Sequence, residues 1–250
     1  MIEEPENHLC HSNLMKMLDQ IKKQIENNQI IITTHNNLIT SRLNLNNVIW
    51  IDKEKSKSLS DIDSKISKFF EKVDNNNFLQ LLLAKKIILV EGATEYLLIP
   101  SIYKKITGAE IESEEITVIS CNGISYQNYL EIGSETKKKI AVITDNDCSQ
   151  KRIDKMNDFN KKNDLQHIFM DKDIENWTWE VCIYNLNEEK LKEIIKIDEK
   201  FDYKFNGKSY EKHLGKMLNT KVETAYDMLS YNFEFEIPKY VKEAIAWIRN

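Results

Sequence analysis

The sequence predicts an α/β protein in which a Rossmann-like parallel sheet is flanked by helices. Two observations carry this prediction. Residues 79–170 alternate between short apolar runs of strand length and longer stretches with helical periodicity. Residues 176–250, in contrast, look mainly helical. Strands that alternate with helices favour a parallel sheet whose faces the helices cover, with a helical region following it.

The predicted elements of the central region can be placed in order. Ile87–Val90 is an unbroken apolar run that reads as a buried strand, and it stops abruptly at Glu91 and Gly92. The further strands are expected at 116–120, 140–144 and 166–170, and the helices between the strands at about 94–106, 125–133 and 150–162. Four more helices are expected at 188–197, 208–218, 221–230 and 238–248.

The first 51 residues form a separate pattern. Apolar residues recur at helical spacing from Leu14 to Ile25, and strands are predicted at Ile30–Thr33 and 48–52. Residues 53–78 are rich in Ser and Lys, which is typical of a solvated connector, with a short helix around Ile62–Val73 and a turn at 74–77.

Composition restricts the function classes. The formal net charge of −5 gives no overall basic signal, so any contact with nucleic acid needs a local patch or metal ions. Only three of the 35 basic residues are arginines, namely Arg42, Arg152 and Arg249. The four cysteines lack metal-site spacing, and no apolar run is long enough to span a membrane. A cytoplasmic protein without a signal peptide is therefore expected.

Acidic residues follow two of the predicted strands. Glu91 ends the first, and Asp145 and Asp147 follow the strand at 140–144. The carboxyl ends of parallel strands meet at one edge of a sheet, so these carboxylates converge if the two strands are neighbours. Glu95, one helical turn after Glu91, points back to the same edge.

Crowded carboxylates repel one another unless a cation lies between them. An all-oxygen ligand set favours Mg²⁺ or Mn²⁺ over Zn²⁺, and one or two such ions suit phosphoryl transfer. A single acid after a strand is also common at a helix N-terminus, and a lone Asp-X-Asp is equally compatible with a turn. The two motifs together, about 50 residues apart in a strand–helix context, favour the metal site.

The paired motifs VEGATE and ITDND resemble those of the toprim domain, which topoisomerases, bacterial primases, recombination mediators and nucleases of the overcoming-lysogenization-defect (OLD) family share. The resemblance covers about residues 85–230. It implies that Glu91, Asp145 and Asp147 are catalytic and bind Mg²⁺. The EGxTE form that places Glu95 is typical of the OLD nuclease branch, and it implies a second metal site.

Two further residues follow from the same resemblance. Glu180, in WTWE, corresponds to a metal-binding Glu that follows a Thr-X pair. Lys221, in NTKVETAYDML, corresponds to a catalytic Lys that would stabilise negative charge developing on phosphorus. A solvated helical Glu and a solvated helical Lys are the alternative interpretations.

The N-terminal segment resembles a different family. IEEPENHL is similar to the residues after the Walker B strand of ABC-type and SMC-like ATPases, which implies that Glu3 holds Mg²⁺ and Glu4 polarises water. ITTHNNLI resembles the switch segment, with His35 sensing the γ-phosphate of ATP; a surface or capping His is the alternative. No GxxxxGK[ST] motif occurs, so ATP is expected as a cofactor only with a complete ATPase domain.

An ATPase followed by a toprim domain is the architecture of the OLD family, including the nuclease subunit of Gabija-type phage defence. The expected domains are an ATPase remnant at 1–52, a connector at 53–84, a toprim core at 85–185 and its helical C-terminal part at 186–250. The chain is expected to be the C-terminal part of a longer protein, a shortened form of one, or the product of a split gene.

The resemblance implies a Mg²⁺- or Mn²⁺-dependent endonuclease that acts on DNA in antiviral defence, as a homo-oligomer or with a partner ATPase or helicase subunit. One alternative is a catalytically silent or regulatory subunit that binds DNA or a partner ATPase. The other is a topoisomerase or primase, although neither a separate domain for a nucleophilic Tyr nor a zinc module is visible in the sequence.

Overall fold

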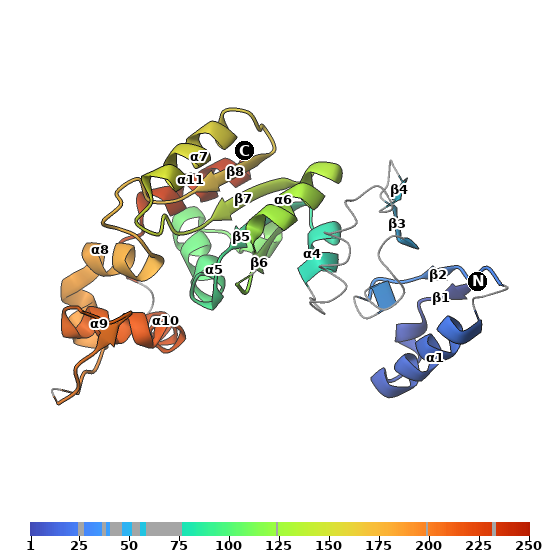
Figure 1. The fold of residues 1–250 in the computed structure, drawn as a ribbon, viewed down its shortest axis with the longest axis horizontal. Coiled ribbons are helices and arrows are strands. Elements are labelled where there is room, and N and C mark those ends of the chain that lie inside the picture. The colour runs from blue at the N-terminus through green and yellow to red at the C-terminus, as the bar shows by residue number, and fades with distance from the viewer. Residues whose placement is uncertain are drawn as a thin grey trace. The chain divides into compact units, whose positions relative to one another are not determined.

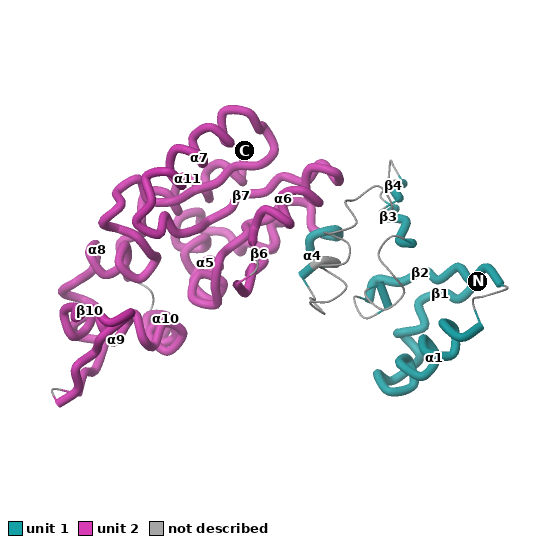
Figure 2. The backbone as a smooth tube through the Cα atoms, in the orientation of Figure 1, with its two compact units in different colours: residues 1–83 teal, residues 84–250 magenta. Residues whose placement is uncertain are grey.

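The computed structural model describes residues 1–24, 28–36, 39–40, 47–51, 56–58, 77–123, 125–198, 200–231 and 234–250. The chain divides into two compact units, Met1–Leu83 and Ala84–Asn250, which Figure 2 colours separately. The helical C-terminal residues belong to the same unit as the strands of the central region. Among the described residues, no helix has the length and apolarity to cross a membrane.

The second unit is built on a four-stranded parallel sheet with the strand order β6-β5-β7-β8 (Figure 1). The strands span β5 (Lys86–Val90), β6 (Ile116–Ser120), β7 (Lys139–Ile143) and β8 (Gln166–Phe169). Val90 pairs with Ser120 on one side and with Ile143 on the other, so β5, β6 and β7 end at the same level. Three strand ends therefore lie side by side at one edge of the sheet.

Helices connect the strands and cover the sheet. The connecting helices are α5 (Ala93–Thr107), α6 (Tyr126–Glu135) and α7 (Gln150–Asn160). Gly108 ends α5 with a φ of 75°, which glycine adopts without steric cost. The last helix, α11 (Lys239–Arg249), packs back against β5, β7 and β8. The C-terminal segment is therefore part of the covering layer of the sheet.

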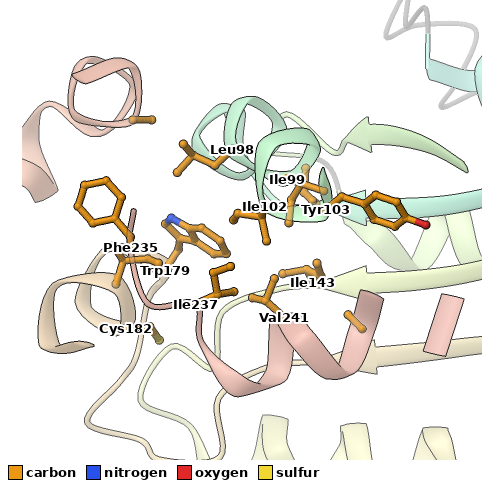
Figure 3. Close-up of a cluster of buried hydrophobic side chains, with 14 of the residues drawn as sticks. Leu98, Ile99, Ile102, Tyr103, Ile143, Trp179, Cys182, Phe235, Ile237 and Val241 are labelled. Carbon is orange, nitrogen blue, oxygen red and sulfur yellow. The ribbon is translucent and has the colours of Figure 1, made fainter. Parts of the chain in front are cut away.

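The core of this unit lies between the sheet and the helices. Ile87, Ile88, Leu89 and Val90 are all 0% exposed, as expected for a central strand that is covered on both faces. Figure 3 shows Trp179 surrounded by side chains from α5, α11 and the segment before α11, among them Leu98 and Ile237.

The C-terminal region contributes three more helices and a hairpin. They are α8 (Trp179–Ile194), the hairpin of β9 (Lys204–Phe205) and β10 (Lys208–Ser209), α9 (Lys212–Asn219) and α10 (Lys221–Ser230). The helix α8 is kinked at Asn187. The side chain of Asn187 there pairs with the backbone of Glu236 in both directions, at 2.9 and 2.6 Å, which ties α8 to the segment before α11.

The first unit contains smaller elements. A two-residue parallel pair joins β1 (Ile2–Glu3) and β2 (Ile32–Thr33), and between them lie the short 3₁₀ helix η1 (Pro5–Asn7) and α1 (His11–Gln24). An antiparallel pair joins β3 (Ile49–Ile51) and β4 (Ser56–Ser58), and α4 (Asn77–Leu83) ends the unit. Leu14, Leu18 and Ile39 form a small buried cluster.

The predicted α/β fold with a parallel sheet is confirmed, and the strands and helices of the central region lie within a few residues of their predicted positions. In the C-terminal region, one predicted helix was missed in part and another was wrong at its start. The helix expected at 188–197 corresponds to the part of α8 after the kink at Asn187, and the part of α8 before the kink was not predicted. Residues 208–211 of the helix expected at 208–218 instead form β10 and the turn before α9. Asn206 and Gly207 adopt positive φ angles and form the turn of the hairpin.

Only part of the predicted connector at 53–84 lies within the described residues. The helix expected around Ile62–Val73 and most of the turn expected at 74–77 lie outside the described residues. Residues 56–58, which were expected to be part of a solvated connector, form strand β4 instead.

Candidate metal-binding active site

The first predicted acid lies where β5 meets β7. Because Val90 pairs with Ile143, Glu91 lies beside Thr144 and Asp145, which follow the end of β7. The Thr144 hydroxyl donates a 2.6 Å hydrogen bond to Glu91 Oε2, and the Asp145 N–H donates a longer one of 3.3 Å to the same oxygen. The predicted convergence of Glu91 and Asp145 is therefore present in the structure.

Asp145 is held from the opposite side by the segment that enters α8. The Thr178 hydroxyl donates to Asp145 Oδ2 at 2.7 Å, and the Trp179 N–H donates to Oδ1 at 2.9 Å. Because the Trp179 indole is fixed in the core (Figure 3), its backbone N–H is a rigid donor. Burial, together with the negative charges of Glu91 and Glu180, raises the pKa of Asp145 to about 7 against the opposing effect of the Thr178 hydrogen bond.

Glu95 projects from the first turn of α5 and is 5% exposed. Burial raises its pKa to about 8, and repulsion from Asp145, Glu180 and Glu91 adds to the rise. These four carboxylates therefore interact electrostatically. Glu95 and Glu180 are buried residues of α5 and α8, and Glu91 and Asp145 are partly buried residues of the loops after β5 and β7.

Lys221 compensates part of this negative charge. Lys221, the first residue of α10, donates a 2.8 Å hydrogen bond to Glu180 Oε2. The Thr178 hydroxyl oxygen lies 2.9 Å from the same oxygen, so Thr178 bridges Glu180 and Asp145, with one proton that it can donate to either carboxylate. The Glu180 side chain is 3% exposed, and an ionised carboxylate at that depth needs such a partner. The structure thus brings both Glu180 and Lys221 to the carboxylates.

Asp147 lies apart from the buried carboxylates. Its backbone has a φ of 51°, a left-handed conformation, and its side chain is 52% exposed. The Asp147 N–H donates to the Trp177 carbonyl at 3.1 Å, while its carboxylate forms an ion pair with Arg152. Asp147 therefore stands at the rim of the site with a cationic partner of its own.

The residues present fit a hard divalent cation by their chemistry. Every predicted ligand is a carboxylate, and two of them have pKa values raised by burial and by one another. In the described part of the chain, however, no three Asp, Glu, His or Cys side chains form a ready-made metal cluster. Glu91, Asp145, Glu180 and Asp147 are each engaged by Thr144, Thr178, Lys221 and Arg152 respectively.

Several residues that shape the site were not singled out from the sequence. Thr144 and Thr178 orient the carboxylates, and Arg152 holds Asp147. Asn146 is 1% exposed, and its side-chain NH₂ lies 2.8–3.1 Å from the backbone carbonyls of Asp171, Asp173 and Asn176. These contacts hold the loop before α8 in place. In the sequence, the position of Asn146 between Asp145 and Asp147 was the local pattern that pointed to them.

The N-terminal unit places some of its predicted residues together. The carboxyl ends of β1 and β2 are adjacent, and His35 Nδ1 lies 3.5 Å from both Glu4 Oε1 and Glu6 Oε1. Glu6, which was not predicted, also accepts hydrogen bonds from the Thr34 hydroxyl and the His35 N–H. Glu3 lies on β1 and is exposed. The structure thus joins Glu4 to His35.

The sequence segment that carries Glu91, Glu95, Asp145 and Asp147 is similar to a known domain family. Residues 82–147 match the family model of the overcoming-lysogenization-defect-protein-like toprim domain. Residues 82–147 therefore carry the sequence pattern of an OLD-like toprim domain. The matched segment of this toprim domain includes Glu91, Glu95, Asp145 and Asp147, whereas Glu180 and Lys221 follow it in the chain.

A curated protein is also similar to this chain in sequence. The chain is 27% identical over 135 residues to the Old nuclease of Escherichia phage P2. That alignment includes 49% of this chain and 23% of the phage protein, so the chain spans less than a quarter of that relative's length.

Solved structures are also similar to this chain. The C-terminal region of the Burkholderia pseudomallei OLD protein gives a TM-score of 0.48 at 17% identity, covering 67% of this chain and 98% of that chain. The C-terminal region of the Xanthomonas campestris pv. campestris OLD protein gives a TM-score of 0.46 at 15% identity, covering 67% of this chain and 95% of that chain.

Proposed function

We propose that this protein is a Mg²⁺- or Mn²⁺-dependent endonuclease that hydrolyses phosphodiester bonds of DNA. The observation that carries the proposal is the electrostatic cluster of Glu91, Glu95, Asp145 and Glu180 at the carboxyl ends of β5 and β7, with Lys221 beside it. The OLD-like toprim match and the similarity to a phage nuclease support the same reaction class.

In this proposal Glu91, Glu95, Asp145 and Glu180 hold the divalent ions, and Asp147 contributes from the rim. Divalent ions held there would supply an activated water and would stabilise negative charge on the scissile phosphate. Thr144 and Thr178 keep Glu91 and Asp145 in fixed orientations through their hydrogen bonds.

Lys221 has a separate role in the proposal. Its ammonium group contacts Glu180 and lies close enough to Asp145 and Glu95 for their charges to act on it. Burial lowers the pKa of Lys221, but Glu180 and the other carboxylates outweigh that effect and raise it, so the lysine stays charged. A fixed positive charge there would stabilise the negative charge that develops on phosphorus.

Nicking of supercoiled plasmid DNA tests the proposal. The wild-type protein should nick the plasmid with Mg²⁺ or Mn²⁺ and should stop when EDTA is added. Asp145→Asn and Glu91→Gln should each lower the rate by at least about 10³-fold, because each removes a charge from the metal site. Glu114→Gln is the control, because Glu114 pairs with Arg249 away from the cluster. Equal nicking by Asp145→Asn and wild type would overturn the proposal.

A silent or regulatory subunit remains the second candidate, and the pairing of Asp147 with Arg152 is the observation that favours it. In that case the wild-type protein would bind DNA or a partner ATPase without nicking. Phage defence, ATP as a cofactor of a complete ATPase domain, and assembly as a homo-oligomer or with an ATPase or helicase partner also belong to the proposal. In it, Glu3, Glu4 and His35 are the vestige of an ATP site.

A further inference from the structure

Arg152 links the two acidic strand ends of the toprim site. It lies in the first turn of α7, and its guanidinium pairs with Asp147 through Nη1. Nη2 donates a 3.2 Å hydrogen bond to Thr144 Oγ1, and the Thr144 hydroxyl in turn donates to Glu91 at 2.6 Å. One side chain is thus connected to the carboxylates that follow both β5 and β7.

An arginine is unusual at any position of this chain. Of 35 basic residues only three are arginines, so lysine is the ordinary way in which this sequence places a positive charge. The two arginines in the described part of the chain both use their planar fork. Arg249 donates to both oxygens of Glu114 at 2.9 and 2.8 Å, and Arg152 spans Asp147 and Thr144. The same fork matches the oxygens of a phosphate, which a lysine contacts only as a point charge.

The contact between Arg152 and Asp147 is suited to exchange. The two side chains are 32% and 52% exposed, and ion pairs at such exposure are weak because water competes for both charges. Lys221 is different, since its partner Glu180 is 3% exposed and has little access to water. A divalent cation drawn to Asp147 would repel the guanidinium, whereas the phosphate of a bound DNA strand would attract it.

We propose that Arg152 is a phosphate-binding residue, which pairs with Asp147 in the metal-free protein and transfers to a DNA phosphate when a divalent cation takes that carboxylate. This inference rests on the proposed nuclease function, because it assumes that metal and DNA meet at the toprim edge. It assigns the substrate contact to a residue that is no metal ligand.

Two binding measurements on the full chain test the inference without requiring cleavage. The first is calorimetric titration with Mn²⁺ alone. The second is the anisotropy of a fluorescein-labelled DNA duplex titrated with protein in Ca²⁺. Arg152→Gln should bind Mn²⁺ about threefold to tenfold more tightly, because a competing positive charge has left the site. The same variant should bind the duplex about tenfold more weakly, because a charged phosphate contact is lost.

Arg152→Lys and Arg249→Gln complete the test. Arg152→Lys keeps the charge without the fork, so its Mn²⁺ affinity should stay near that of wild type while its DNA affinity falls by a few fold. It also serves if Arg152→Gln does not fold. Arg249→Gln removes the same group from the Glu114 pair and should change neither affinity.

An Arg152→Gln or Arg152→Lys variant that binds the duplex as tightly as wild type would overturn the phosphate contact. Unchanged Mn²⁺ affinity in Arg152→Gln would overturn the exchange at Asp147. Failure of the proposed function has a different signature, since wild-type protein would then leave plasmid intact while the two affinities could still be compared among the variants.

Discussion

Both units of this chain place acidic residues at the carboxyl ends of paired parallel strands, but the pKa values of these acids are shifted in opposite directions. In the second unit, residues Ile87–Val90 of the central strand β5 are fully buried, and the nearby Glu95 and Asp145 have pKa values raised to about 8 and about 7 by burial and mutual repulsion. In the first unit, β1 and β2 are two residues long. The pKa of Glu6 there is lowered, although burial opposes this, by hydrogen bonds from Thr34 and His35.

The opposite pKa shifts of these acids have opposite effects on the stability of the folded protein. Acidic groups whose hydrogen bonds favour ionisation contribute to folding, as Glu6 does. Acidic groups that are buried against one another destabilise the folded protein at neutral pH until a cation neutralises them. Carboxyl pKa values raised by burial and by neighbouring carboxylates are typical of functional sites. The comparison therefore favours the carboxyl ends of β5 and β7 as the functional site.

The largest expected effect concerns the strands themselves. Ile88→Ala removes side-chain atoms from the buried centre of β5 and should lower the free energy of unfolding by about 2–5 kcal/mol. Ile32→Ala, on the partly buried strand β2, should cost less than half as much. Urea denaturation of both variants measures the two values. Equal costs would show that the two sheet edges do not differ in rigidity.

The next largest effect is expected from removing the positive charge of Lys221. Lys221→Met should reduce plasmid nicking by about 10²-fold, because an electrostatic contribution to the transition state is lost. Lys239→Met provides the control, since Lys239 forms an exposed pair with Glu243 on α11. A Lys221→Met protein that nicks at the wild-type rate would leave the lysine with a structural role alone.

The burial of Glu95 should be visible as a pH effect on stability. The folded carboxyl keeps its proton up to a pH of about 8, whereas an unfolded one loses it near 4.5, so the wild type loses stability as the pH rises between those values. Glu95→Gln cannot ionise. In buffer with EDTA, its melting temperature relative to wild type should therefore rise from pH 5 to pH 8. A difference that stays constant over this range would contradict the raised pKa of Glu95.

The smallest effect is expected at Glu6, with the opposite sign. Because its pKa is lowered in the folded protein, its contribution to stability is present above about pH 4.5 and is lost on acidification. Glu6→Gln should accelerate hydrogen exchange in α1 relative to wild type at pH 7, and the difference should shrink at lower pH. If the difference in exchange rate between Glu6→Gln and wild type grew on acidification, the pKa of Glu6 would be raised in the folded protein, like that of Glu95.

The fold of the central region could be predicted because its signals are local. Apolar runs such as Ile87–Val90 determine the strands, and the parallel order then brings Glu91 and Asp145 to one edge. The β9–β10 hairpin was missed because apolar residues after Gly207 continue a helical spacing. Asn206 and Gly207 were nevertheless a turn signal in the sequence.

The details of the site depend on contacts between distant residues. Thr178 bridges Asp145 and Glu180 from 33 and 2 positions away, and Lys221 reaches Glu180 across 41 positions, so no local pattern specifies these contacts. The departure of Asp147 from the buried group follows from a left-handed backbone that a non-glycine residue seldom adopts. Family resemblance named Glu180 and Lys221, whereas Arg152 and Asn146 required the structure.

Proton release on metal binding tests the central claim most directly, namely that the buried carboxylates of the toprim edge form a divalent-cation site. Titration calorimetry with Mn²⁺ at pH 7, repeated in buffers of different ionisation enthalpy, measures that release. Because the pKa values of Glu95 and Asp145 are about 8 and about 7, Mn²⁺ should displace about one proton or more from the wild-type protein, and Asp145→Asn should release fewer. Mn²⁺ binding without proton release, or no binding at all, would contradict the account.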